Sequence, residues 1–255
     1  MNQENIRIGT IGYCHKNWLG NFYPQFCPQA DFLRYYSLKF QAVELEKDFT
    51  QPPDRQLVQK WIKTTPQEFA FSIRFPKTVT HEGTLKSRLA AAEKFIAHIR
   101  RLKDKLGPLL LQFPYSFRPQ SREACLILKG ILEAMPSDLR VALDLENKCW
   151  QCDDLFLWLK KHNVALCLVD HPWVPRLNIQ TADFLYLRFV GDTKAVRGDF
   201  THVCVDRDQE MQQWSQLIQE LISSRLEVFG FFGNHYSGHA PSTARKMQSL
   251  VGGRP

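Results

Sequence analysis

Ionisable and hydrogen-bonding side chains recur near the carboxyl ends of short apolar segments in this sequence. Glu44 and Asp144 lie in two such segments, and His81 follows a third. Carboxyl and imidazole groups often transfer protons in catalysis, so these three are the predicted catalytic residues. The predicted substrate-binding residues are Tyr13, Arg74, Gln112, Trp150, Arg188 and Asn234. Two of these are arginines, and a guanidinium group suits a carboxylate or phosphate, so the pattern predicts a small anionic ligand.

A structural role for the same carboxylates is the main alternative. Glu44 and Asp144 stand inside apolar segments, where a charge is costly unless it is paired. Either could be ion-paired to Arg74 or Arg188 as part of the core. His81 could likewise be a loop histidine with satisfied hydrogen bonds. Both interpretations stay open from the sequence.

Two cysteines have the spacing of a redox pair or of half a zinc site, in the segment Cys149-Trp-Gln-Cys152. The sequence has no second pair at zinc-finger spacing and no thioredoxin-like context, so coincidence is the favoured interpretation. His235 and His239 are four residues apart, but Gly238 between them indicates a loop rather than a helical metal-binding pair.

Metal and cofactor sites have little support in the spacing of the remaining candidates. One set could in principle meet in a barrel mouth, namely Glu44, His81, Asp144, Asp170 and His235. Nothing in the spacing favours that set, so no metal site is predicted. The sequence also lacks a P-loop, a nucleophile elbow and a dinucleotide-binding fingerprint, so the cofactor, if any, stays unknown.

Eight short apolar segments must position these side chains. They are nearly continuous rather than alternating, which is typical of strands covered on both faces. The predicted strands are Ile6–Ile11, Gln41–Leu45, Phe69–Phe75, Pro108–Phe113, Arg140–Leu145, Val164–Val169, Phe184–Val190 and Glu227–Phe232.

Segments with helical periodicity follow most of these strands. A helix from Leu85 is predicted to end at Gly107 and Pro108. Another is predicted over 119–135, with Pro119 in its first turn. The remaining expected helices are a stripe that contains Met211, Trp214, Ile218 and Leu221, a helix capped by Asp153 or Asp154, and shorter helices over 29–40, 53–63 and 241–249. In 171–183, Pro172 and Pro175 leave room for a short helix at most.

Eight β–α units in 255 residues predict a single-domain (β/α)8 TIM-type barrel over 1–255. A doubly wound open sheet is the alternative, but the segment Gly9-Thr-Ile-Gly12 lies in a strand rather than in a glycine-rich first turn. In such a barrel the carboxyl ends of the strands converge on one face, which would gather the candidate residues into one mouth.

Composition limits the class of protein. The chain has 33 Lys and Arg against 26 Asp and Glu, a net charge of +7 that moderately favours anionic partners. Seven cysteines without regular spacing favour a reducing compartment. The sequence has no apolar run long enough to cross a membrane and no signal peptide. A soluble cytoplasmic protein is therefore expected, of unknown oligomeric state.

Motifs spread along nearly the whole chain resemble the YecE-like family, whose shared region is domain of unknown function 72 (DUF 72). They are Ile8-Gly-Thr-Ile-Gly-Tyr13, Phe22-Tyr-Pro24, Val43-Glu-Leu45, Phe71-Ser-Ile-Arg-Phe-Pro76, Leu106-Gly-Pro-Leu-Leu-Leu-Gln-Phe-Pro114, Ala142-Leu-Asp144, Tyr186-Leu-Arg188 and Asn234-His-Tyr. The resemblance implies a TIM-type barrel and supplies no reaction.

Several positions depart from the pattern of that family, so the chain resembles a divergent member. After Glu44 the family tends to have asparagine, a pair of small hydroxyl residues and then Phe-Tyr, where this chain has Glu46, Lys47, Asp48, Phe49 and Thr50. Arg74 replaces a lysine of the family. Glu146 and Asn147 stand where the family has arginine and histidine, and Val190 replaces another histidine. These changes remove possible acid–base groups and add negative charge to the expected mouth.

Three functions are compatible with this sequence. The first is an enzyme that acts on a small polar, anionic substrate at the barrel mouth. The second is a ligand-binding or regulatory barrel without catalysis, which the departures from the family pattern favour. The third is nucleic-acid binding or processing, which rests on the net charge of +7 and on aromatic residues near strand ends.

Overall fold

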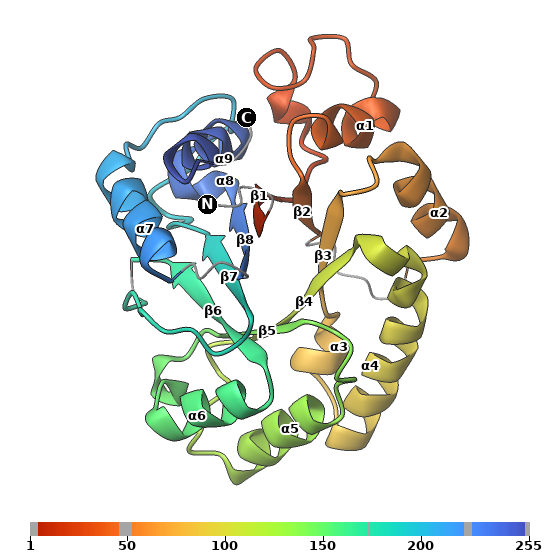
Figure 1. The fold of residues 1–255 in the computed structure, drawn as a ribbon, viewed down its shortest axis with the longest axis vertical. Coiled ribbons are helices and arrows are strands. Elements are labelled where there is room, and N and C mark those ends of the chain that lie inside the picture. Colours follow the sequence, from red (N-terminus) through yellow and green to blue (C-terminus); the bar gives the residue numbers. More distant parts are fainter. Residues whose placement is uncertain (1–4, 46–52, 173, 222–225, 253–255) are drawn as a thin grey trace.

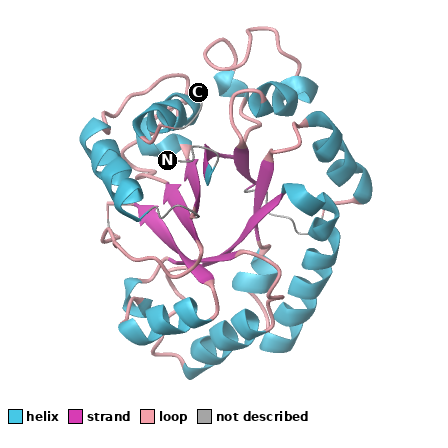
Figure 2. Cartoon of the chain, viewed as in Figure 1, coloured by secondary structure: helices cyan, strands magenta, loops and turns pink. Residues whose placement is uncertain are grey.

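Eight parallel strands form a closed barrel in the computed structural model, which describes residues 5–45, 53–172, 174–221 and 226–252. Each strand pairs with the next, and β8 pairs with β1 (Figures 1 and 2). The strands are β1 (Ile6–Ile11), β2 (Ala42–Leu45), β3 (Ala70–Arg74), β4 (Leu106–Phe113), β5 (Val141–Leu145), β6 (Val164–Asp170), β7 (Phe184–Phe189) and β8 (Glu227–Phe232). The predicted (β/α)8 TIM-type barrel is confirmed.

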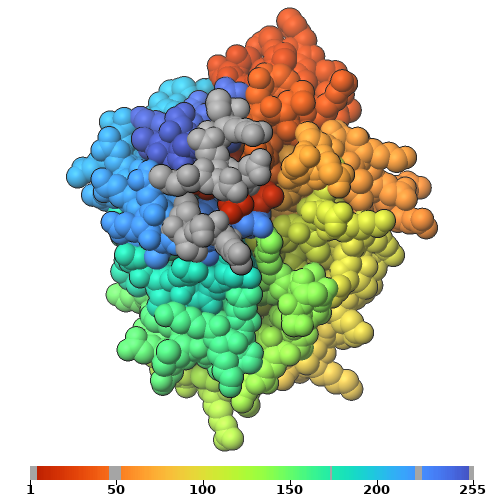
Figure 3. Space-filling view, in the orientation of Figure 1, coloured from red at the N-terminus to blue at the C-terminus, as the bar shows by residue number. Residues whose placement is uncertain are grey.

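Helices surround the barrel, and the colours of successive units follow one another around the molecule (Figure 3). They are α1 (Phe32–Ser37), α2 (Arg55–Thr64), α3 (Lys77–Thr80), α4 (Leu85–Ile99), α5 (Arg122–Glu133), α6 (Asp153–Lys161), α7 (Asp208–Leu221), α8 (Asn234–Ser237) and α9 (Ala240–Leu250). Within the described ranges, every helix is too short or too polar to cross a membrane.

Three predicted helix boundaries are wrong. Helix α4 ends at Ile99 and continues as a 3-10 helix, so Gly107 lies inside β4 and does not cap a helix. A Cβ atom at Gly107 would lie 3.2 Å from the Phe71 carbonyl oxygen of β3, so close strand contact rather than helix capping explains this glycine.

The start of α5 differs because a hydroxyl side chain caps it. Ser121 accepts a hydrogen bond from the Ala124 amide, so Pro119 lies before the helix and not in its first turn. Helix α6 begins after Cys152 without a side-chain cap. Asp153 and Asp154 therefore lie in its first turn, where their negative charges interact favourably with the helix dipole.

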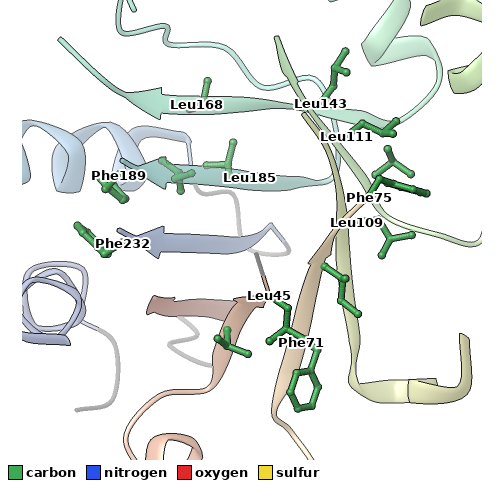
Figure 4. Close-up of a cluster of buried hydrophobic side chains, with 14 of the residues drawn as sticks. Leu45, Phe71, Phe75, Leu109, Leu111, Leu143, Leu168, Leu185, Phe189 and Phe232 are labelled. Atoms are coloured by element: carbon green, nitrogen blue, oxygen red, sulfur yellow. The ribbon is translucent and has the colours of Figure 1, made fainter. Parts of the chain in front are cut away.

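Two apolar layers hold the barrel together. The smaller cluster fills its interior with side chains such as Ala42, Ala142 and Phe229. The larger cluster lies between the strands and the helices, and Figure 4 shows several of its members, among them Leu143 and Leu168. Alternate residues of each strand enter the two clusters, as a strand covered on both faces requires.

The connection between β6 and β7 lacks a helix in its described part, residues 171–172 and 174–183. This agrees with the prediction that Pro172 and Pro175 allow no more than a short helix. The described part of this connection is therefore irregular, whereas the other β–β connections contain a helix.

A partly exposed ion network lies at the amino-terminal end of the barrel. Arg7 Nη1 donates to Glu227 Oε2 at 2.6 Å, and Arg140 donates to both oxygens of the same carboxylate. Both guanidinium groups lie over the Phe229 ring. Burial alone would raise the pKa of the Glu227 carboxyl, but the hydrogen bond and charge of Arg140, with the charge of Arg7, lower it below its usual value.

We expect Glu227→Gln to destabilise the fold at neutral pH but not in acid. Because the native pKa is lowered, the stabilisation by Glu227 is fully present above the ordinary pKa of glutamate and is lost as pH falls through the native pKa. Denaturant unfolding at several pH values measures this, with the exposed Glu93→Gln as control. A pH-independent difference between variant and wild type would contradict the role of the carboxylate.

Candidate functional site

A cavity of about 870 Å³ opens at the carboxyl ends of the strands. Its lining includes residues from the ends of β4 to β7 and from the segments that follow β1, β5 and β8. Five of the predicted site residues line it: Gln112, Asp144, Trp150, Arg188 and Asn234. Barrel enzymes hold their substrates on this face, because the loops after the strands converge there.

The floor of the cavity is an arginine held between two carboxylates. Arg188 donates from Nε and Nη2 to the two oxygens of Glu44, at 3.1 and 3.0 Å, and from Nη1 to Asp144 Oδ2 at 2.9 Å. The three side chains are 6%, 0% and 7% exposed for Arg188, Glu44 and Asp144. The pairing to Arg188 that the sequence left open is the one observed. The guanidinium charge is thus already balanced from within the protein.

Glu44 lies below the cavity and does not line it. Besides the two bonds from Arg188, its Oε2 accepts a hydrogen bond from the Tyr186 hydroxyl at 2.8 Å. Burial raises the pKa of Tyr186 well above its usual value, which keeps this hydroxyl a donor. Ser72 Oγ lies 2.6 Å from the same hydroxyl and extends the network across the barrel. This arrangement lets Glu44 position Arg188, and it keeps the Glu44 carboxylate out of contact with a ligand in the cavity.

Asp144 differs from Glu44 because it lines the cavity. Burial raises its pKa, the charge of Arg188 opposes that shift, and the charges of Glu146 and Glu44 add to it. The net direction is upward, so this carboxyl exchanges a proton closer to neutral pH than an ordinary aspartate. The neighbouring Cys167 thiol also lines the cavity, and burial raises its pKa, so the thiol stays protonated.

One rim of the cavity is built by hydrogen bonds around Glu146. Its Oε1 accepts from Gln112 Nε2 at 2.9 Å, and its Oε2 accepts from the Tyr115 amide at 3.0 Å. Gln112 Oε1 accepts in turn from Arg74 Nη1 at 3.0 Å. Glu146, which stands where the family has arginine, thus holds Gln112 in place. Trp150 lies on this rim, where its Nε1 donates to the Phe117 carbonyl at 2.8 Å.

The opposite rim carries Asn234, whose Oδ1 accepts from Trp18 Nε1 at 3.1 Å and from the Ala240 amide at 3.2 Å. His15 lies near Asn234 and also lines the cavity, and burial lowers the pKa of its imidazole. His235 lines it as well, with Nδ1 2.9 Å from the Val196 carbonyl oxygen. Both histidines lie within four residues of the end of a predicted strand, and that position is the signal that could have added them to the predicted set.

Four predicted site residues do not line the cavity: Tyr13, Glu44, Arg74 and His81. The exposed His81 follows the short helix α3, and its Nδ1 lies 2.8 Å from Thr80 Oγ1. Burial and the charge of Lys77 lower the pKa of its imidazole. Tyr13 accepts a hydrogen bond from the Tyr23 hydroxyl at its backbone carbonyl. The predicted position Glu46 lies outside the described residues.

The described residues contain no group of three or more histidine, cysteine or acidic side chains that could hold a metal ion. Asp170 Oδ2 instead accepts hydrogen bonds from Trp214 Nε1 at 2.5 Å and from the Tyr236 hydroxyl at 3.1 Å. Cys149 and Cys152 are both exposed and unlinked.

Comparisons with known proteins agree in fold and family. The family model described as "Protein of unknown function DUF72" matches residues 7–255. The chain is 23% identical to the UPF0759 protein YunF of Bacillus subtilis, over 96% of this chain and 94% of that protein. It is 24% identical to the UPF0759 protein YecE of Escherichia coli K12 over 144 residues, which are 56% of this chain and 48% of that protein.

Solved structures show the same barrel. A DUF72 family protein of Thermotoga maritima (TM1631) superposes with a TM-score of 0.81 at 25% identity, covering 97% of this chain and 99% of that chain. A DUF72 family protein of Enterococcus faecalis (EF0366) gives a TM-score of 0.80 at 20% identity, covering 98% and 96% of the two chains. These similarities carry no substrate or reaction with them.

Proposed function

The chain belongs to the DUF72 family of proteins of unknown function, and from the geometry of its barrel mouth we propose that it is an enzyme in which Asp144 exchanges a proton with a small polar substrate. The observation that carries the proposal is the position of this carboxyl. Asp144 lines the cavity, and its burial raises its pKa. A carboxyl tuned in this way is typical of a general acid or base.

Arg188 and Glu44 act as positioning residues in this proposal. The bond from Arg188 Nη1 holds one oxygen of Asp144, and Glu44 holds the rest of the guanidinium in place. A catalytic group fixed in this way loses little entropy when the substrate binds. The proposal assigns the proton exchange to Asp144 and a positioning role to Glu44, and the catalytic role of His81 stays a prediction.

The charges around the cavity favour an uncharged polar group over the anionic ligand expected from the sequence. Among the described lining residues, the two acids Asp144 and Glu146 balance the two bases Lys148 and Arg188. Arg188 is in addition paired with Glu44 beneath the floor. A hydroxyl, carbonyl or amide group can bond to Asp144 without adding an uncompensated charge.

A thermal-shift panel on the purified protein tests this proposal. The panel contains polyols, sugars, amides and nucleosides against sugar phosphates, organic acids and nucleotides, with divalent metals with and without EDTA and short oligonucleotides as further classes. A ligand at about 100 times its Kd stabilises the fold by about 2.7 kcal/mol. At this size the melting temperature should rise by about 5–10 °C. We expect the uncharged polar class to produce this shift.

Asp144→Ala should weaken the binding of that ligand by about tenfold or more, because a hydrogen bond to a charged group is lost. Asp183→Ala is the matched control, because Asp183 is exposed and precedes β7 at the opposite end of the barrel. A shift by anionic ligands only, or equal affinities in the two variants, would contradict the proposal.

A further inference from the structure

The cavity is larger than a small polar substrate requires. Its volume of about 870 Å³ lies high in the range of about 300–1,000 Å³ that is typical of pockets for drug-sized ligands. The polar residues described above occupy its floor and rims. Seven further lining residues, from β5, α6, β6 and the segment after β6, are apolar: Leu145, Leu155, Leu166, Leu168, Val174, Pro175 and Leu177. The polar residues Gln151, His171 and Thr193 also line the cavity.

We call this apolar part of the cavity the side arm and define it by those seven residues. It extends out of the interior of the barrel. Cys167 of β6 belongs to the apolar cluster inside the barrel, whereas Leu166 and Leu168 belong to the cluster outside it. Since the same cavity touches both sets, it passes over the carboxyl ends of the strands and continues along their outer face. Figure 4 draws Leu168 among the buried side chains of the larger cluster.

The described part of the connection between β6 and β7 contains no helix, which leaves space for the side arm. Val174, Pro175 and Leu177 belong to this connection, and Leu155 of α6 closes the other side. Leu155 and Leu177 pack against the outer apolar cluster and are only half-buried. An apolar ligand that covered them would therefore gain further burial.

We infer that the substrate is amphipathic, with an uncharged polar head at Asp144 and an apolar tail in the side arm. The inference rests on the proposed function for the position of the head. The tail is carried independently by the continuity of the cavity and by its leucine, valine and proline lining. The apolar tail also explains the size of the cavity, which a small polar head alone would leave largely empty.

A series of linear amides from acetamide to hexanamide tests the inference. Each methylene that enters the side arm should tighten binding about fourfold, so hexanamide should bind about 15-fold more tightly than butanamide. NMR titration of isotope-labelled protein gives the Kd of each amide. Contacts between the tail methyl group and the leucine methyl groups locate the tail.

Two leucines of α6 provide a matched pair of variants. Leu155 lines the side arm, whereas Leu157 is 64% exposed and does not line the cavity. Leu155→Gln should weaken hexanamide about tenfold and leave butanamide nearly unchanged, because it places an amide against the tail. Leu157→Gln should change neither. If Leu155→Gln does not fold, Leu177→Gln replaces it.

The outcomes separate the side arm from the proposed function. A dependence on chain length that Leu155→Gln removes supports the inference. If the dependence is present but Asp144→Ala leaves every affinity unchanged, the side arm stands and the proposed role of Asp144 falls. Equal affinity for all chain lengths, or no binding of any amide, would overturn the inference.

Discussion

Arg188→Ala should lower the free energy of unfolding by about 3–5 kcal/mol, because it leaves the Glu44 carboxylate buried without its charged partner. Glu44 is 0% exposed, and the substitution removes both hydrogen bonds that it accepts from Arg188. At this chain length the melting temperature should fall by about 6–20 °C. Denaturant and thermal unfolding measure the two quantities.

A double variant tests whether the loss comes from the unpaired charge. Glu44→Gln with Arg188→Met removes both charges, and a neutral replacement of a buried ion pair is often tolerated. We expect the double variant to recover most of the stability lost in Arg188→Ala. A loss below about 1 kcal/mol in Arg188→Ala, the level of an exposed ion pair, would show that the pair does not hold the floor of the cavity.

Asp144→Asn should reduce turnover by about 10²–10⁴-fold, the usual contribution of a general acid or base. Asparagine has nearly the same shape and still accepts a bond from Arg188, but it cannot exchange a proton. The measurement is kcat on a substrate from the class that the ligand panel identifies. Asp183→Asn at the other end of the barrel serves as the control and should keep full activity.

The same substitution should leave the free energy of unfolding at pH 7 unchanged or raise it, although it lowers turnover. Because burial raises the native pKa of Asp144, its carboxyl binds a proton more tightly in the native state than in the unfolded chain. Its contribution to stability is fully present below the ordinary aspartate pKa of about 3.9 and is lost as pH rises through the native pKa. Asp144→Asn does not ionise, so it should be at least as stable as the wild type at pH 7.

Together these measurements distinguish a catalytic carboxyl from a scaffold carboxyl. Loss of turnover with unchanged or higher stability identifies Asp144 as a residue kept for function at some cost to the fold. Loss of stability with unchanged turnover would instead make Asp144 a partner of Arg188 and nothing more. We therefore expect Glu44 and Asp144 to differ in role, although both were predicted as catalytic residues from the sequence.

Local patterns in the sequence determined the barrel. Strands such as β1 and β8 have the predicted bounds because an apolar run between turn residues is a property of a few neighbouring residues. The same patterns placed polar residues at the strand ends, and five of the predicted site residues line one cavity. Helix boundaries were less accurate where a cap or a close strand contact decides them, as at Ser121 and Gly107.

Only the tertiary structure decided the depth and partner of each side chain. Strand periodicity tells which face a residue occupies, but the register between strands sets its height along the barrel, and that register depends on contacts far apart in the sequence. Arg188 meets a carboxylate 144 residues away, which puts Glu44 beneath the cavity and leaves Asp144 on its floor. The side arm likewise depends on tertiary packing. Its lining residues come from β5, α6, β6 and the irregular segment after β6, and local sequence patterns do not predict how these elements pack together.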